Sequence, residues 1–182
     1  QWLDKDTGRI NKNRYGQYLG EFFADDMILI LHRDGSYLLQ NHASIVKVDM
    51  EQMVHIERFH AEAPISAVYY DGASKNWYVK RFLIETKPDT KSHSYISDHA
   101  DSKLLYVTTA ANPLIEIEIY KGKAKTKEIT PIDFVEFIDV KGWKAQGNRL
   151  TQFEFRGKWK DLTQYEIVEE SVAEEEEEKE KK

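Results

Sequence analysis

Residues 27–39 of the 182-residue chain read MILILHRDGSYLL, and this stretch indicates the fold class. Its apolar run, residues 27–31, is long enough for one strand but far short of the roughly 18 residues that a membrane span needs. The Asp-Gly pair at 34–35 is typical of a two-residue hairpin turn, and the apolar residues at 37–39 start a second strand. The stretch therefore predicts a β-hairpin.

Three further pairs of strand-like segments follow this hairpin. The turn centres of all four pairs lie near residues 35, 72, 111 and 145. A recurrence of about 40 residues with several strands per unit is typical of propeller-like blades, and a plain β-sandwich is the alternative. The three further pairs are 65–70 with 77–84, 104–109 with 114–120, and 135–140 with 150–155.

The net charge of −6 comes entirely from the C-terminal end of the chain. Residues 1–165 carry 23 basic and 23 acidic side chains, whereas residues 166–182 carry nine Glu and three Lys. The last segment has too little apolar surface to offset the entropy of ordering, so we expect one domain, 1–165, and a disordered acidic tail, 166–182. The acidic global charge therefore does not argue against a polyanionic partner.

The start of the chain, its cysteine content and its lack of catalytic motifs limit the classes of protein to which it could belong. The sequence begins at Gln1 with no secretory signal pattern. Because no initiator Met precedes Gln1, we expect a fragment of a longer protein. Because cysteine is absent, disulfides and thiolate zinc sites are excluded, which fits a reducing cytoplasm. The sequence has no HExxH, GxxxxGK[ST], GxGxxG or GxSxG motif, and its six histidines are scattered. A small β-rich enzyme is therefore the weakest of the functional hypotheses.

Positive charge is concentrated late in the domain, where residues 121–165 carry ten basic and six acidic side chains. Lysines at alternate positions of 121–127 would form one row if that segment were extended. Such a row could neutralise backbone phosphates without reading bases. A propeller-like protein-interaction module is the alternative, and it would use the surfaces of Trp77, Trp143 and Trp159. Core packing, however, is the commoner fate of tryptophan.

Several segments resemble the C-terminal region of the A subunit of bacterial DNA topoisomerase IV, especially of the Bacteroidetes type. The resemblance covers nearly all of residues 2–160 and implies a β-pinwheel. This is an all-β ring of propeller-like blades, here about three to four in an open or reduced ring, whose basic edge binds and bends double-stranded DNA. The similar segments are 3–22 (LDKDTGRINKNRYGQYLGEF), 27–37 (MILILHRDGSY), 67–82 (AVYYDGASKNWYVKRF), 104–107 (LLYV) and 135–151 (VEFIDVKGWKAQGNRLT).

The resemblance also implies a parent enzyme, an ATP-dependent type IIA topoisomerase (an isomerase) that works with a B subunit and Mg²⁺. Such an enzyme acts in the bacterial cytoplasm, in association with the nucleoid. The fragment itself is then a DNA-binding accessory domain that guides DNA-segment capture for topology change, with no catalytic site and no cofactor of its own. The Arg-Tyr pair at 14–15 matches the family's catalytic dipeptide but lies in a Gly/Asn-rich lead-in, so no catalysis is expected there.

Two features refine this expectation. The gyrase-type glutamine/arginine/glycine box is absent, and residues 141–147 (KGWKAQG) resemble at most a degenerate form of it. We therefore expect DNA binding or bending without gyrase-style wrapping. In the tail, residues 174–178 are all Glu. The tail either serves only as a solubilising terminus, or these residues compete with DNA for the basic edge.

The expected DNA contacts are basic side chains in the VKRF segment, in the row at 121–127, in the loop at 141–149 and just after it. Since Lys80 and Arg81 are adjacent in a predicted strand, at most one of them is expected to face DNA. The full set is Lys80, Arg81, Lys121, Lys123, Lys125, Lys127, Lys141, Lys144, Arg149, Arg156 and Lys158.

Overall fold

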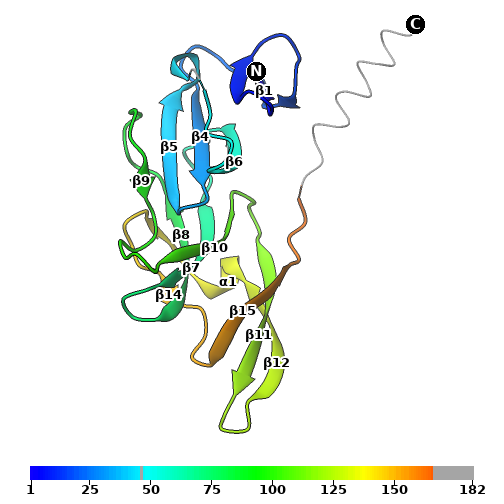
Figure 1. The fold of residues 1–182 in the computed structure, drawn as a ribbon, viewed down its shortest axis with the longest axis vertical. Coiled ribbons are helices and arrows are strands. Elements are labelled where there is room, and N and C mark those ends of the chain that lie inside the picture. Colours follow the sequence, from blue (N-terminus) through cyan, green and yellow to red (C-terminus); the bar gives the residue numbers. More distant parts are fainter. Residues whose placement is uncertain (46, 166–182) are drawn as a thin grey trace, which may run out of the picture.

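The regular structure of the chain consists almost entirely of strands (Figure 1). The structure, a computed structural model, describes residues 1–45 and 47–165. In these ranges fifteen strands form four sheets, named A to D below, with one short helix, α1 (Phe134–Phe137), and one 3-10 turn, η1 (His42–Ser44). The predicted all-β class with propeller-like blades is confirmed, whereas the predicted acidic tail, 166–182, lies outside the described residues. No helix of the described ranges is long and apolar enough to cross a membrane.

Sheets A and B contain the first six strands and one strand from later in the chain. Sheet A has the order β2-β1-β3, and sheet B has the order β6-β4-β5-β9. The hairpin predicted from residues 27–39 is confirmed as β4–β5. The predicted two-residue turn is wrong, because Leu31 pairs with Tyr37 and the turn contains three residues, 33–35. Gly35 in this turn has a φ of 84°. The bounds are β1 (Trp2–Asp4), β2 (Arg9–Asn11), β3 (Gln17–Tyr18), β4 (Met27–His32), β5 (Ser36–Asn41), β6 (Met53–Arg58) and β9 (His93–Ser94).

Sheets C and D contain the remaining strands. Sheet C has the order β10-β7-β8-β13, with β14 also paired to β8, and sheet D has the order β12-β11-β15. The predicted hairpin of 65–70 with 77–84 is confirmed as β7–β8. The bounds are β7 (Ile65–Asp71), β8 (Asn76–Leu83), β10 (Lys103–Thr108), β11 (Leu114–Lys121), β12 (Thr126–Asp133), β13 (Val140–Gly142), β14 (Asn148–Arg149) and β15 (Glu154–Asp161).

The other two predicted hairpins are wrong. Strands β10 and β11 form where predicted but do not pair: β10 joins β7 in sheet C, and β11 pairs with β12 and β15 in sheet D. The two strands instead face each other across a core that contains Tyr106 and Ile117. The predicted strand at 135–140 begins as helix α1, because the Asp133 side chain accepts a hydrogen bond from the Val135 N–H and caps the helix.

Three apolar clusters lie between neighbouring sheets, so the sheets stack in the order A, B, C, D. In β4, Ile28 and Ile30 pack toward sheet A, while Leu29 and Leu31 pack toward sheet C. Successive strand residues point to opposite faces, so the unbroken apolar run of β4 reflects burial on both sides. Strand β11 alternates instead, because its Ile residues face sheet C and its Glu residues lie on the outer face of sheet D. The sheets therefore stack as successive blades of an open row.

Neighbouring sheets exchange strands in a repeated pattern. Strand β9 follows sheet C's hairpin in the chain but pairs with β5 of sheet B. Strands β13 and β14 follow the β11–β12 hairpin but pair with β8 of sheet C. In both cases, the segment that follows one hairpin pairs with the second strand of an earlier hairpin, in the neighbouring sheet. Residues 141–149, between and including parts of β13 and β14, are called the basic loop below.

Candidate nucleic-acid interface

Two of the expected DNA contacts, Lys80 and Arg81, are buried, with 2% and 7% of their surface exposed. Both faces of β8 are covered, since sheet B packs on one side and sheet D on the other. The Arg81 side chain donates hydrogen bonds to the Ser66 hydroxyl (3.0 Å) and to the Ala111 carbonyl (3.2 Å). Burial lowers the pKa of Lys80 to about 8 and also lowers the pKa of Arg81. The structure therefore places both side chains inside the domain, whereas the list of expected DNA contacts requires them to be exposed.

The lysines at 121–127 do not form the expected row, because the segment is a hairpin end rather than one extended strand. Lys121 ends β11 and Lys127 lies in β12, paired to β11. Between them the chain turns through Gly122 (φ 68°) and Lys125 (φ 52°). Lys123 and Lys125 therefore project from the tip, and Lys121 and Lys127 lie on opposite faces of sheet D.

Most basic side chains of sheet D are paired with carboxylates of the same sheet. Glu118, in the central strand, lies 2.9 Å from Lys127 Nζ and 3.3 Å from Lys158 Nζ. The hydrogen bond from Lys127 is the largest cause that lowers the pKa of Glu118, and Glu118 in turn raises the pKa of Lys127. Lys121 pairs with Glu128. These pairs reduce the positive charge that the sheet presents to a partner.

Glu154, which pairs with Tyr120 near the hairpin end of the sheet, has the same neutralising effect. Its carboxylate lies 2.9 Å from the Arg156 guanidinium and 3.5 Å from Lys125 Nζ. The Arg156 guanidinium also stacks over the Tyr120 ring, 3.9 Å from its centroid. Arg156 is therefore held on the sheet by two contacts and is not free to follow a phosphate.

The basic loop presents three positive side chains that are exposed: Lys141, Lys144 and Arg149. None of the three forms an ion pair with a described residue. Lys141 lies in β13, paired opposite Phe82, and Arg149 lies in β14, paired opposite Tyr78. The loop thus lines the outer edge of sheet C with uncompensated charge.

Three contacts and one close backbone approach hold the basic loop in place. The Trp143 ring packs edge-on against Tyr37 of sheet B, with 5.8 Å between centroids. The Tyr69 hydroxyl donates to the Gln146 carbonyl (2.6 Å), and Lys80 Nζ donates to the Trp143 carbonyl (2.7 Å). Gly147 has a φ of 89°, and a Cβ placed there would lie 2.2 Å from the Val79 carbonyl oxygen. The loop is therefore preorganised.

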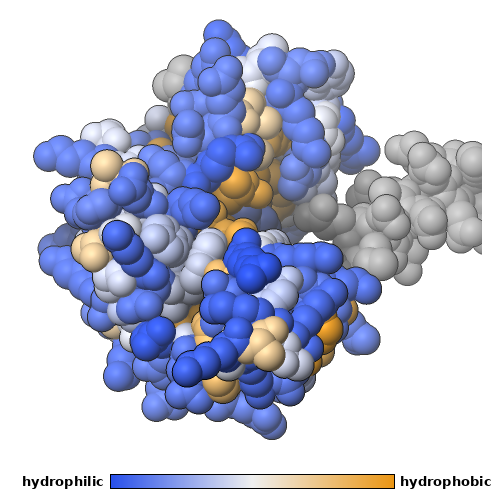
Figure 2. Space-filling view, turned by 60° about the horizontal axis from the view of Figure 1, so that its bottom comes forward, coloured by the Kyte–Doolittle hydropathy of each residue, from blue (hydrophilic) through white to orange (hydrophobic). Residues whose placement is uncertain are grey.

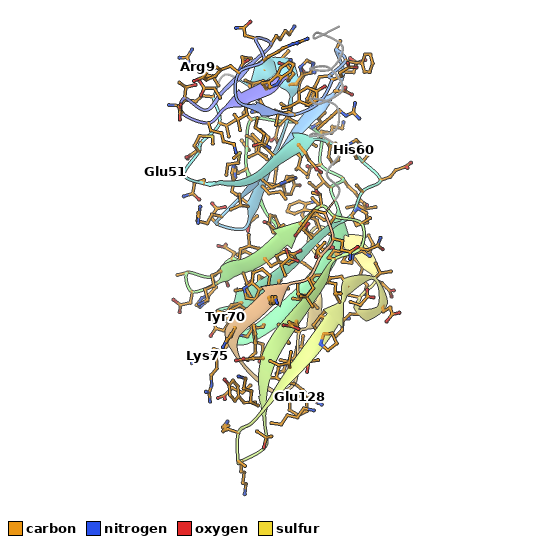
Figure 3. The ribbon with its side chains drawn as sticks, turned by 90° about the vertical axis from the view of Figure 1, so that its right-hand side faces the viewer. Arg9, Glu51, His60, Tyr70, Lys75 and Glu128 are labelled. Atoms are coloured by element: carbon orange, nitrogen blue, oxygen red, sulfur yellow. The ribbon has the colours of Figure 1, made fainter. Side chains whose placement is uncertain are left out.

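Two basic residues that the sequence reasoning did not select lie in sheet C or its turn. Lys103 Nζ lies 5.8 Å from the Tyr70 centroid and 5.6 Å from the Trp77 centroid. Lys75 lies in the β7–β8 turn with a φ of 59°, and Figure 3 shows it far from Arg9 of sheet A. The turn position of Lys75 follows from the predicted hairpin, whereas the position of Lys103 requires the register of β10 with β7.

The tryptophans on which the protein-interaction alternative depends are packed against core clusters. Trp143 packs against the cluster between sheets B and C, and Trp77 and Trp159 pack against the cluster between sheets C and D. On the face drawn in Figure 2, hydrophilic side chains cover most of the area and hydrophobic ones gather in a hollow. This face therefore presents mainly polar and charged groups.

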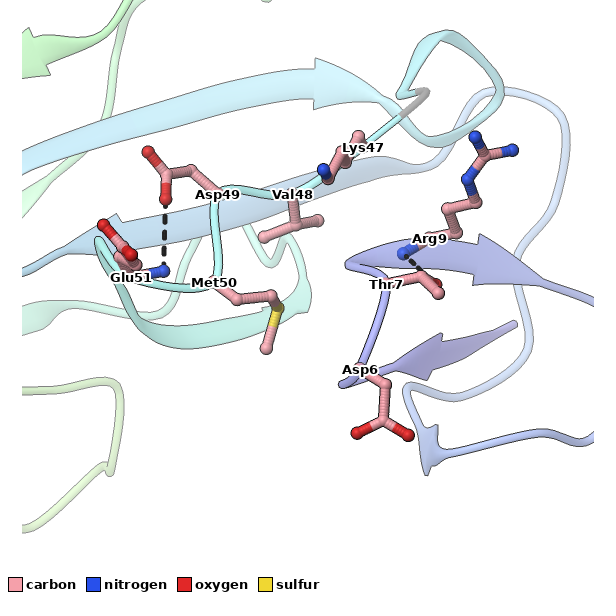
Figure 4. Close-up of a pocket in the computed structure, with 8 residues that line it drawn as sticks. All are labelled: Asp6, Thr7, Arg9, Lys47, Val48, Asp49, Met50 and Glu51. Carbon is pink, nitrogen blue, oxygen red and sulfur yellow. Dashed lines mark hydrogen bonds between the residues drawn. The ribbon is translucent and has the colours of Figure 1, made fainter.

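A cavity of about 720 Å³ lies between sheet A and the segment 47–51. Figure 4 shows its polar side chains engaged in local turns: Asp49 accepts a hydrogen bond from the Glu51 N–H, and Thr7 accepts one from the Arg9 N–H. No group of three or more potential ligand side chains in the described residues could hold a metal ion. The cavity therefore shows no convergent set of catalytic groups.

Comparison with known proteins identifies a family and a fold. The family described as "Topoisomerase C-terminal domain, Bacteroidota" matches residues 9–157. No curated protein sequence matches the chain. A solved structure described as "Crystal structure of the C-terminal domain of DNA topoisomerase IV" is similar, with a TM-score of 0.52 and 16% identity over 88% of this chain and 54% of the other. The chain thus spans about half the length of that structure, and the likeness is one of fold.

Proposed function

The chain belongs to the family of topoisomerase C-terminal domains of Bacteroidota, and on this premise we propose that it binds duplex DNA for its parent enzyme. It is a non-catalytic accessory domain, and its role is to hold and bend a DNA segment that the enzyme captures. The basic loop is the principal contact. Sheet D, whose cations are largely compensated by Glu118, Glu128 and Glu154, is a secondary contact.

One observation carries this proposal: the exposed, unpaired cations of the basic loop stand on a rigid segment. Lys141, Lys144 and Arg149 are exposed and form no ion pair with a described residue, so a phosphate oxygen would not have to displace a carboxylate. Preorganised groups lose less conformational entropy on binding. Contacts of this kind give affinity without base specificity.

The remaining parts of the proposal concern the parent enzyme. We assign the ATP site, the Mg²⁺ ions and the DNA-breaking tyrosine to other domains and to a B subunit, so that this domain acts only on DNA geometry. Its setting in this proposal is the bacterial cytoplasm, on the nucleoid. Because the gyrase-type box is absent, the domain bends DNA without wrapping it.

A salt titration of duplex DNA binding tests the proposal. Each phosphate contact contributes about 0.9 to the slope of log affinity against log salt, so three contacts lose about 40-fold in affinity between about 50 and 200 mM salt. Fluorescence anisotropy with a labelled duplex measures the slope. The variant K141Q/K144Q/R149Q should lose most of the slope that these three phosphate contacts contribute.

A matched variant removes the same net charge elsewhere. Lys5, Lys12 and Arg14 are exposed on the sheet A side of the chain, so K5Q/K12Q/R14Q keeps the basic loop intact. We expect its slope to fall by less than about one. Equal losses in the two triple variants, or binding that does not respond to salt, would disprove the assignment to the loop.

A further inference from the structure

Lys80 is a buried cation without a carboxylate partner among the described residues. Lysine is almost never fully buried unless it is paired, because its ammonium group must leave water. Here Lys80 Nζ donates two hydrogen bonds, each of 2.7 Å, to the carbonyls of Tyr95 and Trp143, and it lies 4.9 Å from the Phe82 ring centroid. An unfavourable burial of this kind is retained where the hydrogen bonds determine a specific arrangement.

The two carbonyls belong to segments that are far apart in the sequence. Tyr95 follows β9, the strand that pairs with β5 of sheet B. Trp143 belongs to the basic loop, and its ring packs against Tyr37 and His93 of sheet B. One ammonium group therefore links sheet C, the segment after the exchanged strand β9, and the basic loop.

Two pockets adjoin both Lys80 and the basic loop. They have volumes of about 190 and 260 Å³, and Ala145 and Gln146 of the loop line both of them. Where a pocket lies against the loop, the loop makes fewer close packing contacts, so apolar packing holds it less there. The hydrogen bonds that Lys80 and Tyr69 donate to the loop therefore help to fix its position.

We infer that Lys80 is a positioning residue, which fixes the basic loop on sheets B and C and so sets the spacing of Lys141, Lys144 and Arg149 toward a phosphate backbone. Lys80 itself does not touch DNA. An ammonium group suits this position because its three N–H donors can serve two carbonyls from separate segments. An apolar side chain of the same length would fill the space but leave both carbonyls without that donor. The inference rests on the proposed function only for its DNA-binding consequence.

The absence of cysteine from the sequence allows an atom-level test. The substitution Lys80→Cys introduces a single thiol into the full chain. Alkylation of the unfolded chain with bromoethylamine, followed by refolding, restores an ammonium group at the length of lysine. Alkylation with bromopropane gives a neutral side chain of nearly the same shape. The two products differ only in the ammonium group.

Hydrogen–deuterium exchange of backbone amides reads the loop directly, without DNA. In the propyl form we expect exchange at residues 93–96 and 141–149 to be about tenfold faster than in the aminoethyl form, because two hydrogen bonds are lost there. Exchange at the hairpin end, 121–127, should be equal in the two forms. Equal exchange in the loop, or uniform acceleration across all three segments, would overturn the inference.

DNA affinity provides the second readout and separates this inference from the proposed function. The propyl form should bind DNA less tightly than the aminoethyl form, and this difference should vanish in the K141Q/K144Q/R149Q background. A difference that persists in that background would show that Lys80 acts elsewhere and would refute the positioning role. If the unmodified chain does not bind DNA, the proposed function fails, while the exchange data still decide whether Lys80 positions the loop.

Discussion

Raising the pH should stabilise the fold, because Lys80 is buried as a cation. Burial lowers its pKa from 10.5 to about 8. Below pH 8, Lys80 is protonated in the folded and unfolded states alike. Between about 8 and 10.5 it is neutral when folded and protonated when unfolded, so the unfolded state binds more protons and the free energy of unfolding rises with pH.

The size of the effect follows from the shift of the pKa. One pKa unit corresponds to about 1.4 kcal/mol, so the full shift corresponds to about 3 kcal/mol, of which about 2 kcal/mol is gained between pH 7 and 9.5. Buried tyrosines act in the opposite direction at higher pH, since burial raises the pKa of Tyr69, Tyr95 and Tyr106. The range up to about pH 9.5 therefore lies mostly below the titration of the tyrosines.

Urea unfolding followed by circular dichroism measures the free energy at each pH. The matched variant is Lys80→Met, which removes the titrating group and retains most of the side-chain volume. The free energy of unfolding of the wild type minus that of the variant should rise by about 2 kcal/mol from pH 7 to 9.5. The other titrating groups are common to both proteins and cancel in this difference. Parallel stability curves would show that Lys80 is not held as a desolvated cation, and the reasoning from its burial would fail.

Three further predictions follow from backbone geometry, acid titration and the tail. Gly147→Ala should destabilise the domain by about 2–4 kcal/mol in urea unfolding, because its Cβ would collide with the Val79 carbonyl. The control Gly122→Ala, at a similar φ but in open space, should cost only about 1 kcal/mol. Equal costs would contradict the close approach of Gly147 to Val79. Hydrogen bonds, of which the one from the Ser74 side chain has the largest effect, lower the pKa of Asp71 from 3.8 to about 2. The wild type should therefore be more stable than Asp71→Asn near neutral pH, and this advantage should shrink as the pH falls through about 2. A difference in urea midpoints that does not change with pH would argue against this. Deletion of residues 166–182 should tighten DNA binding in the anisotropy assay by more than the change in net charge accounts for, and unchanged affinity would reject competition by the tail.

Strands with apolar runs and clear turn residues could be predicted from the sequence, and this accounts for hairpins β4–β5 and β7–β8. Hairpin β11–β12 could not, because β12 is mostly exposed and polar and contains Pro131, as edge strands often do. Its turn carries no Asn-Gly or Asp-Gly pair and depends on Lys125 in a left-handed conformation. Local pattern also favoured pairing β10 with β11, whereas the shared core of sheets C and D separates them.

The candidate site was predictable only in part, because exposure depends on the neighbouring sheets. A strand with charges at adjacent positions normally exposes one of them, yet sheets B and D bury Lys80 and Arg81 from both sides. The ion pairs of Glu118 with Lys127 and Lys158 likewise require the register of three strands. The three cations of the basic loop are exposed, and their contact with DNA stays a prediction. The attachment of the loop to sheets B and C was not visible in the sequence.

The exchange of strands between sheets has a mechanical consequence. Bending a duplex of 20–30 base pairs through 40–90° costs about 1–6 kcal/mol, and the bent DNA exerts a restoring force on the sheet that holds it. Separating sheet C from sheet B would require opening their shared core and also breaking the pairing of Ser36 and Tyr37 with Ser94 and His93. Under the proposed function, a load on the basic loop would pass from β8 along the connecting chain to β9 and so into sheet B. The row of sheets would then resist the elastic force of bent DNA through backbone pairing that joins one sheet to the next.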